Sequence, residues 1–327
     1  MSSSIAFRRS PKPGALTPTT IIDELCAFLQ LTEENQKKIY RSPRFILNIP
    51  VRLAQKIEKN RLDDPIFRQF VPLNEEHLDT FGFTMDPVCD SSFQKGKKIL
   101  HKYHGRALWL ATSSCAMHCR YCFRQNFTYE SSQSSHSEEL GYLKENTDIQ
   151  ELILSGGDPL SLSNHQLQNL LKEFDSIPHL KRIRFHTRFL IGIPERIDET
   201  LLNILSQVQK QIYFVIHCNH SRELDDDVID ALKRIKKLGI PILNQSVLLK
   251  GINDTENTYL ELCESLSNIG VIPYYLHLLD RVQGSNHFEV SEERGKQILQ
   301  FIQENTSGYA VPRLAKEESG AKSKTFH

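Results

Sequence analysis

The sequence lacks long runs of apolar residues and has no net charge. No stretch approaches the roughly 18 to 20 uninterrupted apolar residues of a membrane helix, and the Ser-rich start MSSSIAFRRSPKPG lacks the apolar middle of a secretory signal. Lys and Arg together number 40, as do Asp and Glu, so the overall charge attracts neither nucleic acid nor an anionic membrane. These absences predict a cytoplasmic protein that binds no membrane and makes no direct contact with nucleic acid.

Internal repeats are also absent, and the cysteines are too unevenly placed for a disulfide framework. The 327 residues include seven cysteines, an odd number in a chain long enough to bury a large core without cross-links. Three of them fall within eight residues, which favours reduced thiols that bind a metal. The other four are expected to be small buried hydrophobic residues or bystanders; they are Cys26, Cys89, Cys218 and Cys263.

Hydrophobic periodicity divides the chain into a helical first part and a longer α/β part. Before residue 95, apolar residues recur at helical spacing behind Thr and Pro, as in TPTTIIDELCAFLQLTEENQ and IPVRLAQKIEKN. Strand-like segments then alternate with amphipathic ones. We therefore expect an N-terminal helical segment (1–94), a main domain (95–310) and a C-terminal tail (311–327).

Six segments rich in β-branched and aromatic residues are the predicted strands of the main domain. They cover residues 107–112, 151–156, 182–187, 211–218, 241–249 and 271–280. Predicted helices lie between them, including 164–177, 194–208, 225–239 and 255–270. This alternation predicts a parallel sheet, either doubly wound or curled into a full or partial barrel, with its chemistry at the carboxyl ends of the strands. The Ser-rich stretch YESSQSSHSEE (129–139) is expected to be a surface loop.

The three clustered cysteines follow the first predicted strand, in the sequence TSSCAMHCRYCFR. One loop carrying Cys115, Cys119 and Cys122 could wrap three soft thiolates around an iron-sulfur cluster or a zinc ion. Structural zinc needs a fourth ligand, and His118 would be a strained one because it adjoins Cys119. Four irons held by three cysteines instead leave one iron open to a substrate or cofactor.

This loop resembles the signature of the radical S-adenosylmethionine superfamily, Cys-x3-Cys-x-aromatic-Cys, with Tyr121 at the aromatic position. The resemblance implies a [4Fe-4S] cluster whose open iron binds S-adenosylmethionine and whose electron releases a 5'-deoxyadenosyl radical. SGGDPL (155–160) ends the second predicted strand and resembles the superfamily's cofactor-binding turn, although GGDP alone is typical of a tight turn. Beside Tyr121, the expected cofactor contacts are therefore Ser155, Gly156, Gly157 and Asp158.

A narrower resemblance, to the lysine 2,3-aminomutase family, covers roughly residues 85 to 326. It rests on the order and spacing of four segments: CRYCFRQNF, SGGDPL, NQSVLLKGIND and YYLHLLDRVQGSNHF. The resemblance implies a partial (β/α)6 TIM-like barrel and an isomerase that converts L-α-lysine to (R)-β-lysine. The implied cofactors are the [4Fe-4S] cluster, S-adenosyl-L-methionine and pyridoxal 5'-phosphate.

The resemblance also implies which residues hold pyridoxal phosphate and the substrate carboxylate. Lys324, in the terminal run SGAKSKTFH, matches the catalytic lysine that bonds the cofactor, with Lys322 as a register alternative. An exposed amine with a pKa of ~10.4 is a poor nucleophile, so the tail should fold into the barrel mouth and be ordered when the cofactor is bound. Tyr103 and Arg106 match further contacts of that cofactor. Arg124 matches the arginine that forks onto the substrate carboxylate.

Two acidic residues match the carboxylates that neutralise the distant ammonium of lysine. They are Asp280, at the end of the sixth predicted strand, and Glu317, for which Glu318 is a register alternative. An enclosed cation without such partners would be costly. Aminomutases proper carry Asp at the second position, so Glu317 has a longer reach here.

Within the family, the chain most resembles the short bacterial branch that makes (R)-β-lysine for elongation factor P. The resemblance rests on DDPIFRQFVP (63–72) and on the end of the chain just beyond Lys324. It implies three partners besides L-lysine: a downstream ligase, elongation factor P and an electron donor such as flavodoxin or ferredoxin. One departure is Cys89 in DPVCD, where the family usually has Gly; we expect a tolerated change with a different turn conformation.

Three other interpretations remain open. The first is a free-standing lysine 2,3-aminomutase for lysine catabolism or β-lysine production. The second is a zinc-bound binding module without catalysis. The third is a radical enzyme that does not use pyridoxal phosphate.

Overall fold

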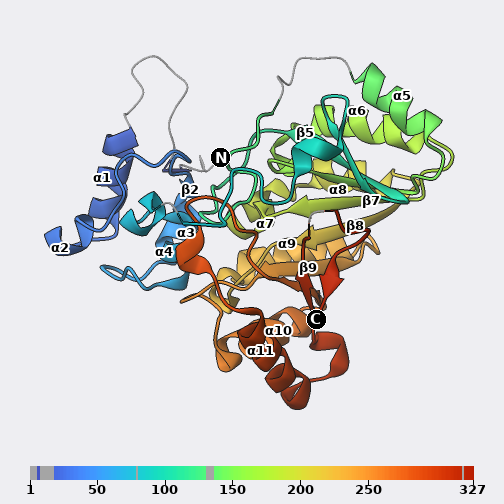
Figure 1. Cartoon of the computed structure of the whole chain (residues 1–327). Helices are drawn as coiled ribbons and strands as arrows, with labels where there is room; N and C mark the ends of the chain where they lie inside the picture. Colours follow the sequence, from blue (N-terminus) through green and yellow to red (C-terminus); the bar gives the residue numbers. More distant parts are fainter. Residues whose placement is uncertain (1–5, 8–17, 79, 130–135, 319) are drawn as a thin grey trace.

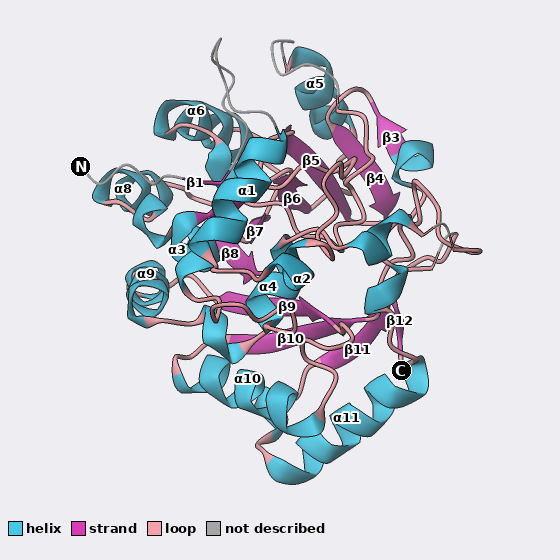
Figure 2. Cartoon of the chain, turned by 90° about the vertical axis from the view of Figure 1, so that its left-hand side faces the viewer, coloured by secondary structure: helices cyan, strands magenta, loops and turns pink. Residues whose placement is uncertain are grey.

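A ten-stranded curved sheet forms the centre of the molecule (Figure 2). The structure is a computed structural model that describes residues 6–7, 18–78, 80–129, 136–318 and 320–327. The strand order is β12-β11-β10-β9-β8-β7-β6-β5-β4-β3, so sequence neighbours are also neighbours in this sheet. The strands from β5 to β11 are parallel. This arrangement confirms the prediction of an α/β protein with a partial barrel of parallel strands.

All six predicted strands are present. They are β5 (Arg106–Thr112), β6 (Glu151–Gly156), β7 (Arg182–Thr187), β8 (Gln211–Ile216), β9 (Ile242–Val247) and β10 (Ile272–His277). A seventh parallel strand, which the sequence analysis missed, is β11 (Arg313–Lys316). Three short antiparallel strands extend the two edges: β3 (Gln94–Lys95), β4 (Ile99–Tyr103) and β12 (Thr325–Phe326).

Helices connect consecutive parallel strands and lie outside the curve of the sheet (Figure 2). The connecting helices are α5 (Ser137–Glu145), α6 (Asn164–Asp175), α7 (Phe189–Gly192), α8 (Glu199–Ser206), α9 (Asp226–Lys236), α10 (Glu256–Asn268) and α11 (Glu292–Asn305). Together with the strands they give six β/α units, as the family resemblance implied. The four predicted helices correspond to α6, α8, α9 and α10.

Helix α9 shows why these segments are helical. The Asp225 side chain caps its start by accepting a hydrogen bond from the N–H of Val228 at 3.2 Å. Acidic residues occupy the first turn and basic residues the last turn, which complements the helix dipole. Its buried face recurs at helical spacing, with Val228, Ala231, Leu232 and Ile235. The face packs toward the sheet.

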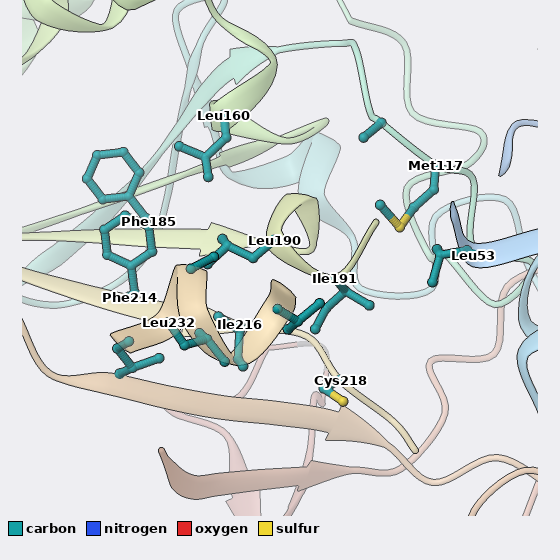
Figure 3. Packing of buried hydrophobic residues seen from close by; sticks show 14 of the residues in the cluster. Leu53, Met117, Leu160, Phe185, Leu190, Ile191, Phe214, Ile216, Cys218 and Leu232 are labelled. Atoms are coloured by element: carbon teal, nitrogen blue, oxygen red, sulfur yellow. The ribbon is translucent and has the colours of Figure 1, made fainter. Parts of the chain in front are cut away.

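The main core lies between the sheet and the outer helices (Figure 3). Strand β7 alternates, with Ile183 and Phe185 buried toward the helices and polar residues on the other face. The rings of Phe185 and Phe214 stack with centroids 4.9 Å apart across β7 and β8. Burial of each such side chain stabilises the fold by about 1.5–3 kcal/mol. The polar face of the strands is thereby left to line the barrel interior.

The N-terminal segment lies on one side of the molecule (Figure 1) and packs against the cysteine loop. It contains β1 (Ala6–Phe7), α1 (Pro18–Phe28), α2 (Glu33–Gln36), β2 (Ile49–Pro50), α3 (Val51–Gln55) and α4 (Pro65–Phe70). A Cβ added to Gly192 would lie 2.4 Å from Cε of Met117 and 3.0 Å from Cγ of Pro50. The absence of a side chain at Gly192 therefore leaves room for Met117 where α7, the cysteine loop and the N-terminal segment meet. The expected boundary after residue 94 falls within β3, and the domain boundaries stay predictions.

The remaining expectations have mixed outcomes. Residues 130–135 of the Ser-rich stretch lie outside the described residues, and α5 begins at its described end. None of the seven cysteines, all of which are described, forms a disulfide, and the predicted burial is confirmed for Cys26, Cys218 and Cys263. Cys89 is partly exposed, and its φ of 54° and ψ of 38° place it in the left-handed region that favours glycine. No helix among the described residues is long and apolar enough to cross a membrane.

Candidate active site

One cavity of about 750 Å³ brings together every site residue expected from the sequence. These residues come from the cysteine loop, the end of the antiparallel strand β4, the ends of the parallel strands and the C-terminal tail. They are Tyr103, Arg106, Cys115, Cys119, Tyr121, Cys122, Arg124, Ser155, Gly156, Gly157, Asp158, Asp280, Glu317 and Lys324. Within the described part of the chain, no group of three or more His, Cys, Asp or Glu side chains is arranged to hold a single metal ion.

The cysteine loop follows β5 at its carboxyl end and is fixed by the N-terminal segment. Nδ1 of His118 lies 2.8 Å from the carbonyl oxygen of Ile46. The guanidinium of Arg120 donates to both carboxylate oxygens of Glu76, and the two side chains are almost completely buried. His118 does not line the cavity that the three cysteines share. His118 and Arg120 thus anchor the loop to the N-terminal segment, while its three cysteines line the cavity.

Burial raises the pKa of Cys115 well above its ordinary value and that of Cys122 to about 11. Neighbouring thiols add to both shifts by Coulomb repulsion. Thiols bind iron as thiolates, so iron binding here would release protons.

The glycines of the SGGDPL turn make room for the cysteine loop. Gly156 has a φ of 112°, and a Cβ on it would lie 2.7 Å from the carbonyl oxygen of Thr112. A Cβ on Gly157 would lie 2.3 Å from the carbonyl oxygen of Ser114. The backbone N–H of Asp158 also donates to Ser114, at 2.8 Å. We expected glycine because a ligand approaches the backbone; the structure shows that the protein's own loop already requires it.

Asp158 uses its carboxylate inside the protein. Its oxygens accept hydrogen bonds from the Thr187 hydroxyl at 2.8 and 3.0 Å and from the backbone N–H of Arg188 at 2.7 Å. It also accepts from the N–H of Leu160 at 3.0 Å. Burial raises its pKa to about 6, although these hydrogen bonds lower it. The side chain therefore joins the carboxyl ends of β6 and β7, and any cofactor contact here falls to the backbone of the turn.

Arg124 is oriented by an acid that the sequence analysis did not single out. Its Nε donates to Oδ2 of Asp90 at 2.7 Å, and its Nη1 donates to the Ser155 hydroxyl at 3.3 Å. Burial by itself lowers the pKa of Arg124, but the Asp90 carboxylate outweighs this and holds the pKa above its ordinary value. The side-on contact leaves the outer edge of the guanidinium for a carboxylate in the cavity.

The C-terminal tail enters the cavity through an antiparallel pair of strands. Ala315 of β11 pairs with Phe326 of β12 (Figure 2), and the turn between them carries Lys324. Nζ of Lys324 lies 2.7 Å from Oε2 of Glu317. The alternatives Lys322 and Glu318 do not line the cavity. The described residues of the tail thus reach the cavity, and an ordered tail with the cofactor bound stays a prediction.

Glu317 collects three hydrogen-bond donors. Besides Lys324, its carboxylate accepts from Nζ of Lys102 at 2.7 Å and from the hydroxyl of Tyr103. Burial raises the pKa of Glu317, but Lys324 and the other donors outweigh it and lower the pKa to about 2. Tyr103, expected to contact pyridoxal phosphate, is bonded to Glu317, and the Arg106 guanidinium lies 4.6 Å from its ring centroid.

Asp280 lies beyond β10 in the same cavity. Burial raises its pKa to about 7, although the nearby Lys324 lowers it. Because Asp280 is buried, a cation that enters the cavity would lower its pKa and favour the ionised carboxylate.

Three histidines were missed by the sequence analysis. His186, His217 and His277 line the cavity, and the buried Nε2 of each has no hydrogen-bond partner among the described residues. Burial lowers the pKa of all three, that of His217 to about 3. Their signal is positional, because each lies inside a predicted strand and within one residue of the carboxyl end of β7, β8 or β10 in the structure.

Comparison with known proteins identifies the family. Residues 104–227 match the model of the 4Fe-4S single cluster domain family. The L-lysine 2,3-aminomutase of Escherichia coli is 40% identical over 308 residues, 93% of this chain and 90% of that protein. The L-lysine 2,3-aminomutase of Haemophilus influenzae is 39% identical over 303 residues, 91% and 90% of the two chains. This chain belongs to the lysine 2,3-aminomutase family, which consists of isomerases of the radical S-adenosylmethionine superfamily.

More distant proteins are also similar. The L-lysine 2,3-aminomutase of Bacillus subtilis is 33% identical over 304 residues, 91% of this chain and 64% of that protein. The crystal structure of Streptococcus suis SuiB bound to S-adenosylmethionine is 14% identical, with a TM-score of 0.49 over 66% of this chain and 51% of that chain.

The cavity fits the cofactors of this family, which are a [4Fe-4S] cluster, S-adenosylmethionine and pyridoxal 5'-phosphate. Three thiols supply the soft donors that an iron-sulfur cluster requires. The unpaired histidine nitrogens are polar groups that a bound ligand could satisfy. Lys102 and Arg106 supply cationic groups for a phosphate. The donor chemistry therefore suits the cluster and the phosphate of pyridoxal phosphate.

Proposed function

We propose that this protein converts L-α-lysine to (R)-β-lysine for the modification of elongation factor P. The observation that carries the proposal is the position of Lys324, whose Nζ lies 2.7 Å from Glu317 inside the cavity that the three cysteines line. A lysine amine, a carboxylate pair and a cysteine loop at one site are the parts that a radical aminomutase acting on a diamino acid needs.

The cofactors would be held by residues from different elements. Cys115, Cys119 and Cys122 would ligate the cluster, with the turn from Ser155 to Asp158 and Tyr121 beside S-adenosylmethionine. Lys324 would bond pyridoxal phosphate, with Tyr103 and Arg106 as further contacts. When bound, these groups supply a carbon radical and make the amino group of the substrate mobile.

The substrate would be held at both ends by charge. The outer edge of Arg124 would receive the α-carboxylate in two parallel hydrogen bonds. Asp280 and Glu317 would receive the distant ammonium group, and the incoming cation would favour the ionised form of Asp280. Burial of these groups excludes water and fixes the substrate close to the reacting atoms.

The branch that serves elongation factor P is proposed on the resemblance of the segment DDPIFRQFVP (63–72). In the structure this segment contributes Gln69 to the contacts of the cysteine loop. The competing proposal is a free-standing aminomutase that serves lysine catabolism or releases β-lysine.

The proposal includes a cellular setting. The cluster would take its electron from a flavodoxin or a ferredoxin, and a downstream ligase would attach the product to elongation factor P. We place the protein in the cytoplasm, where thiols stay reduced.

An anaerobic assay tests the reaction. The protein is incubated with reductant, S-adenosylmethionine, pyridoxal phosphate and L-lysine, and any β-lysine is resolved by chiral analysis. (R)-β-lysine is the expected product, and its absence from protein that carries about four irons and sulfides would overturn the proposal. Slow turnover of free lysine, with loss of the elongation factor P modification on gene deletion, distinguishes the branch from a free-standing enzyme.

Lys324 provides the matched control for the cofactor. Lys324→Ala should lose the absorption band of lysine-bound pyridoxal phosphate, and Lys322→Ala should keep it because Lys322 does not line the cavity. The reverse result would show that the register is wrong. A wild-type protein that makes product without pyridoxal phosphate would support the interpretation in which that cofactor is not used.

A further inference from the structure

Arg188 is a buried cation at the centre of the site that the sequence analysis did not single out. It follows β7 directly, and 6% of its side chain is exposed. Its backbone N–H donates to Asp158, which fixes the chain at this point. The side chain then extends toward the cysteine loop.

The guanidinium of Arg188 contacts a cysteine sulfur. Nη1 lies 3.0 Å from Sγ of Cys119, and it also donates to the hydroxyl of Tyr121. Nη2 donates to Oε2 of Glu223 at 2.7 Å and to Oε1 of Gln69 at 2.6 Å. One planar cation thus joins the cysteine loop, the N-terminal segment and the loop after β8.

The partners of Arg188 are themselves fixed. Oε1 of Glu223 accepts from the backbone N–H groups of Asn219 and His220, each at 3.0 Å, and the side chain is completely buried. The carboxamide of Gln69 donates to Glu223 at 3.2 Å and accepts from Asn219 at 2.9 Å. Because each group is held by others, the guanidinium has little freedom to leave the sulfur.

We propose that Arg188 is a positioning residue for the iron-sulfur cluster, which fixes the Cys119 side chain and raises the reduction potential of the cluster. The inference rests on the proposed function in one respect, which is that Cys119 ligates the cluster. It assigns a role to a residue outside the cysteine signature.

The physical basis is electrostatic. One-electron reduction makes the cluster more negative, and a fixed cation at a ligand sulfur stabilises that reduced form. Hydrogen bonds to cluster sulfurs and local charge are established determinants of such potentials. Arginine suits the position because its guanidinium stays protonated and directs several N–H groups at once. Burial strengthens the effect, since water screens the charge poorly there.

The proposal predicts that removing the charge of either partner of the ion pair shifts the midpoint potential of the cluster, and that the two shifts have opposite signs. Arg188→Gln removes the cation beside the sulfur and should make the midpoint potential more negative. Glu223→Gln removes the opposing anion with little change of shape, so it should make the potential less negative. Both are measured on the reconstituted protein by a mediated redox titration, followed by low-temperature EPR of the reduced cluster.

Two further variants separate this role from a merely structural one. Arg188→Lys keeps the charge and should retain most of the wild-type potential. The double variant Arg188→Gln, Glu223→Gln lacks both partners of the buried ion pair. The midpoint potential of its cluster should still be more negative than in wild type, because Arg188 is the partner that contacts the sulfur. Arg120→Gln with Glu76→Gln removes another buried pair, one that anchors the loop from outside the cavity. That control should lower thermal stability more than it changes the potential.

The outcomes are distinct. Unchanged potentials in the Arg188 and Glu223 variants, or shifts of the same sign in both single variants, would overturn the inference while leaving the proposed function intact. A wild-type protein that binds no iron after anaerobic reconstitution would instead overturn the proposed function.

Discussion

Nζ of Lys324 lies 2.7 Å from Oε2 of Glu317, so the proposed cofactor lysine is ion-paired with a proposed substrate-binding carboxylate. Lys102 and Tyr103 bind the other oxygen of the same carboxylate. The protein's own lysine therefore occupies a position proposed for the ammonium of the substrate. Bonding of Lys324 to a cofactor would free this position.

This relationship predicts that Lys324→Ala improves lysine binding to the cofactor-free protein. Removal of the internal competitor should tighten binding by about tenfold, equivalent to ~1.4 kcal/mol. Isothermal titration calorimetry of L-lysine into protein stripped of pyridoxal phosphate measures the change. Lys322→Ala should behave as wild type, since its side chain does not line the cavity. Equal affinities in wild type and Lys324→Ala would show that the ion pair does not compete with substrate.

Lysine binding should depend on pH through Asp280. Burial raises its pKa to about 7, and only the ionised carboxylate attracts the substrate ammonium. The dissociation constant should therefore rise as pH falls below 7, by about tenfold between pH 7.5 and 6. Titrations of the cofactor-free protein, in which Lys324 keeps its charge, at several pH values test this. Asp280→Asn should bind lysine weakly and without this dependence; a retained pH profile would assign it to another group.

The raised pKa of Asp280 also has a consequence for stability. A carboxylate whose pKa in the folded protein lies above its ordinary value of 3.8 stabilises the fold at low pH, and this contribution is lost as pH rises through 7. Asp280→Asn should therefore make the cofactor-free protein more stable at pH 8 by a few kcal/mol, because each tenfold difference in proton affinity between the folded and unfolded states corresponds to about 1.4 kcal/mol. Urea unfolding at pH 5 and pH 8 measures the difference. If Asp280→Asn raised the free energy of unfolding equally at both pH values, the raised pKa would not belong to Asp280.

Gly157 should be intolerant of a side chain. A Cβ at this position would lie 2.3 Å from the carbonyl oxygen of Ser114, so Gly157→Ala must displace the cysteine loop. We expect about 1–3 kcal/mol of destabilisation and loss of iron after reconstitution. Gly141→Ala is the control, because its Cβ meets nothing within 4 Å on α5, and should stabilise the fold by about 0.5–1 kcal/mol. Full iron content in Gly157→Ala would show that the loop adapts.

Replacement of Cys89 by glycine should stabilise the fold. Its φ of 54° is a left-handed conformation that costs an L-residue about 1 kcal/mol relative to glycine. Cys89→Gly should therefore raise the melting temperature by about 1–2 °C. Cys89→Ala retains a Cβ and should give no such gain. A lower melting temperature in Cys89→Gly would mean that the contacts of the thiol outweigh the backbone preference.

Much of the fold could be predicted because its patterns are local. The alternation of polar and apolar residues in RIRFHT depends on neighbouring residues alone, and β7 covers these six residues. The short strands β11 and β12 have no comparable pattern. They exist because they pair with β10 and with each other, a contact that local sequence does not encode.

The sequence determined which chemical groups this protein can use: three closely spaced thiols, a Gly-Gly turn after a strand, and an alternation that builds a parallel sheet. These features were readable because each involves residues near one another along the chain. Tertiary structure decided which distant groups meet them. Three contacts join residues far apart in the sequence. Asp90 and Arg124 are 34 positions apart, Tyr103 and Glu317 are 214 apart, and Arg188 and Cys119 are 69 apart. Such contacts follow from the way the strand ends and the N-terminal segment pack around one cavity, because burial selects charge pairs through space and not along the sequence.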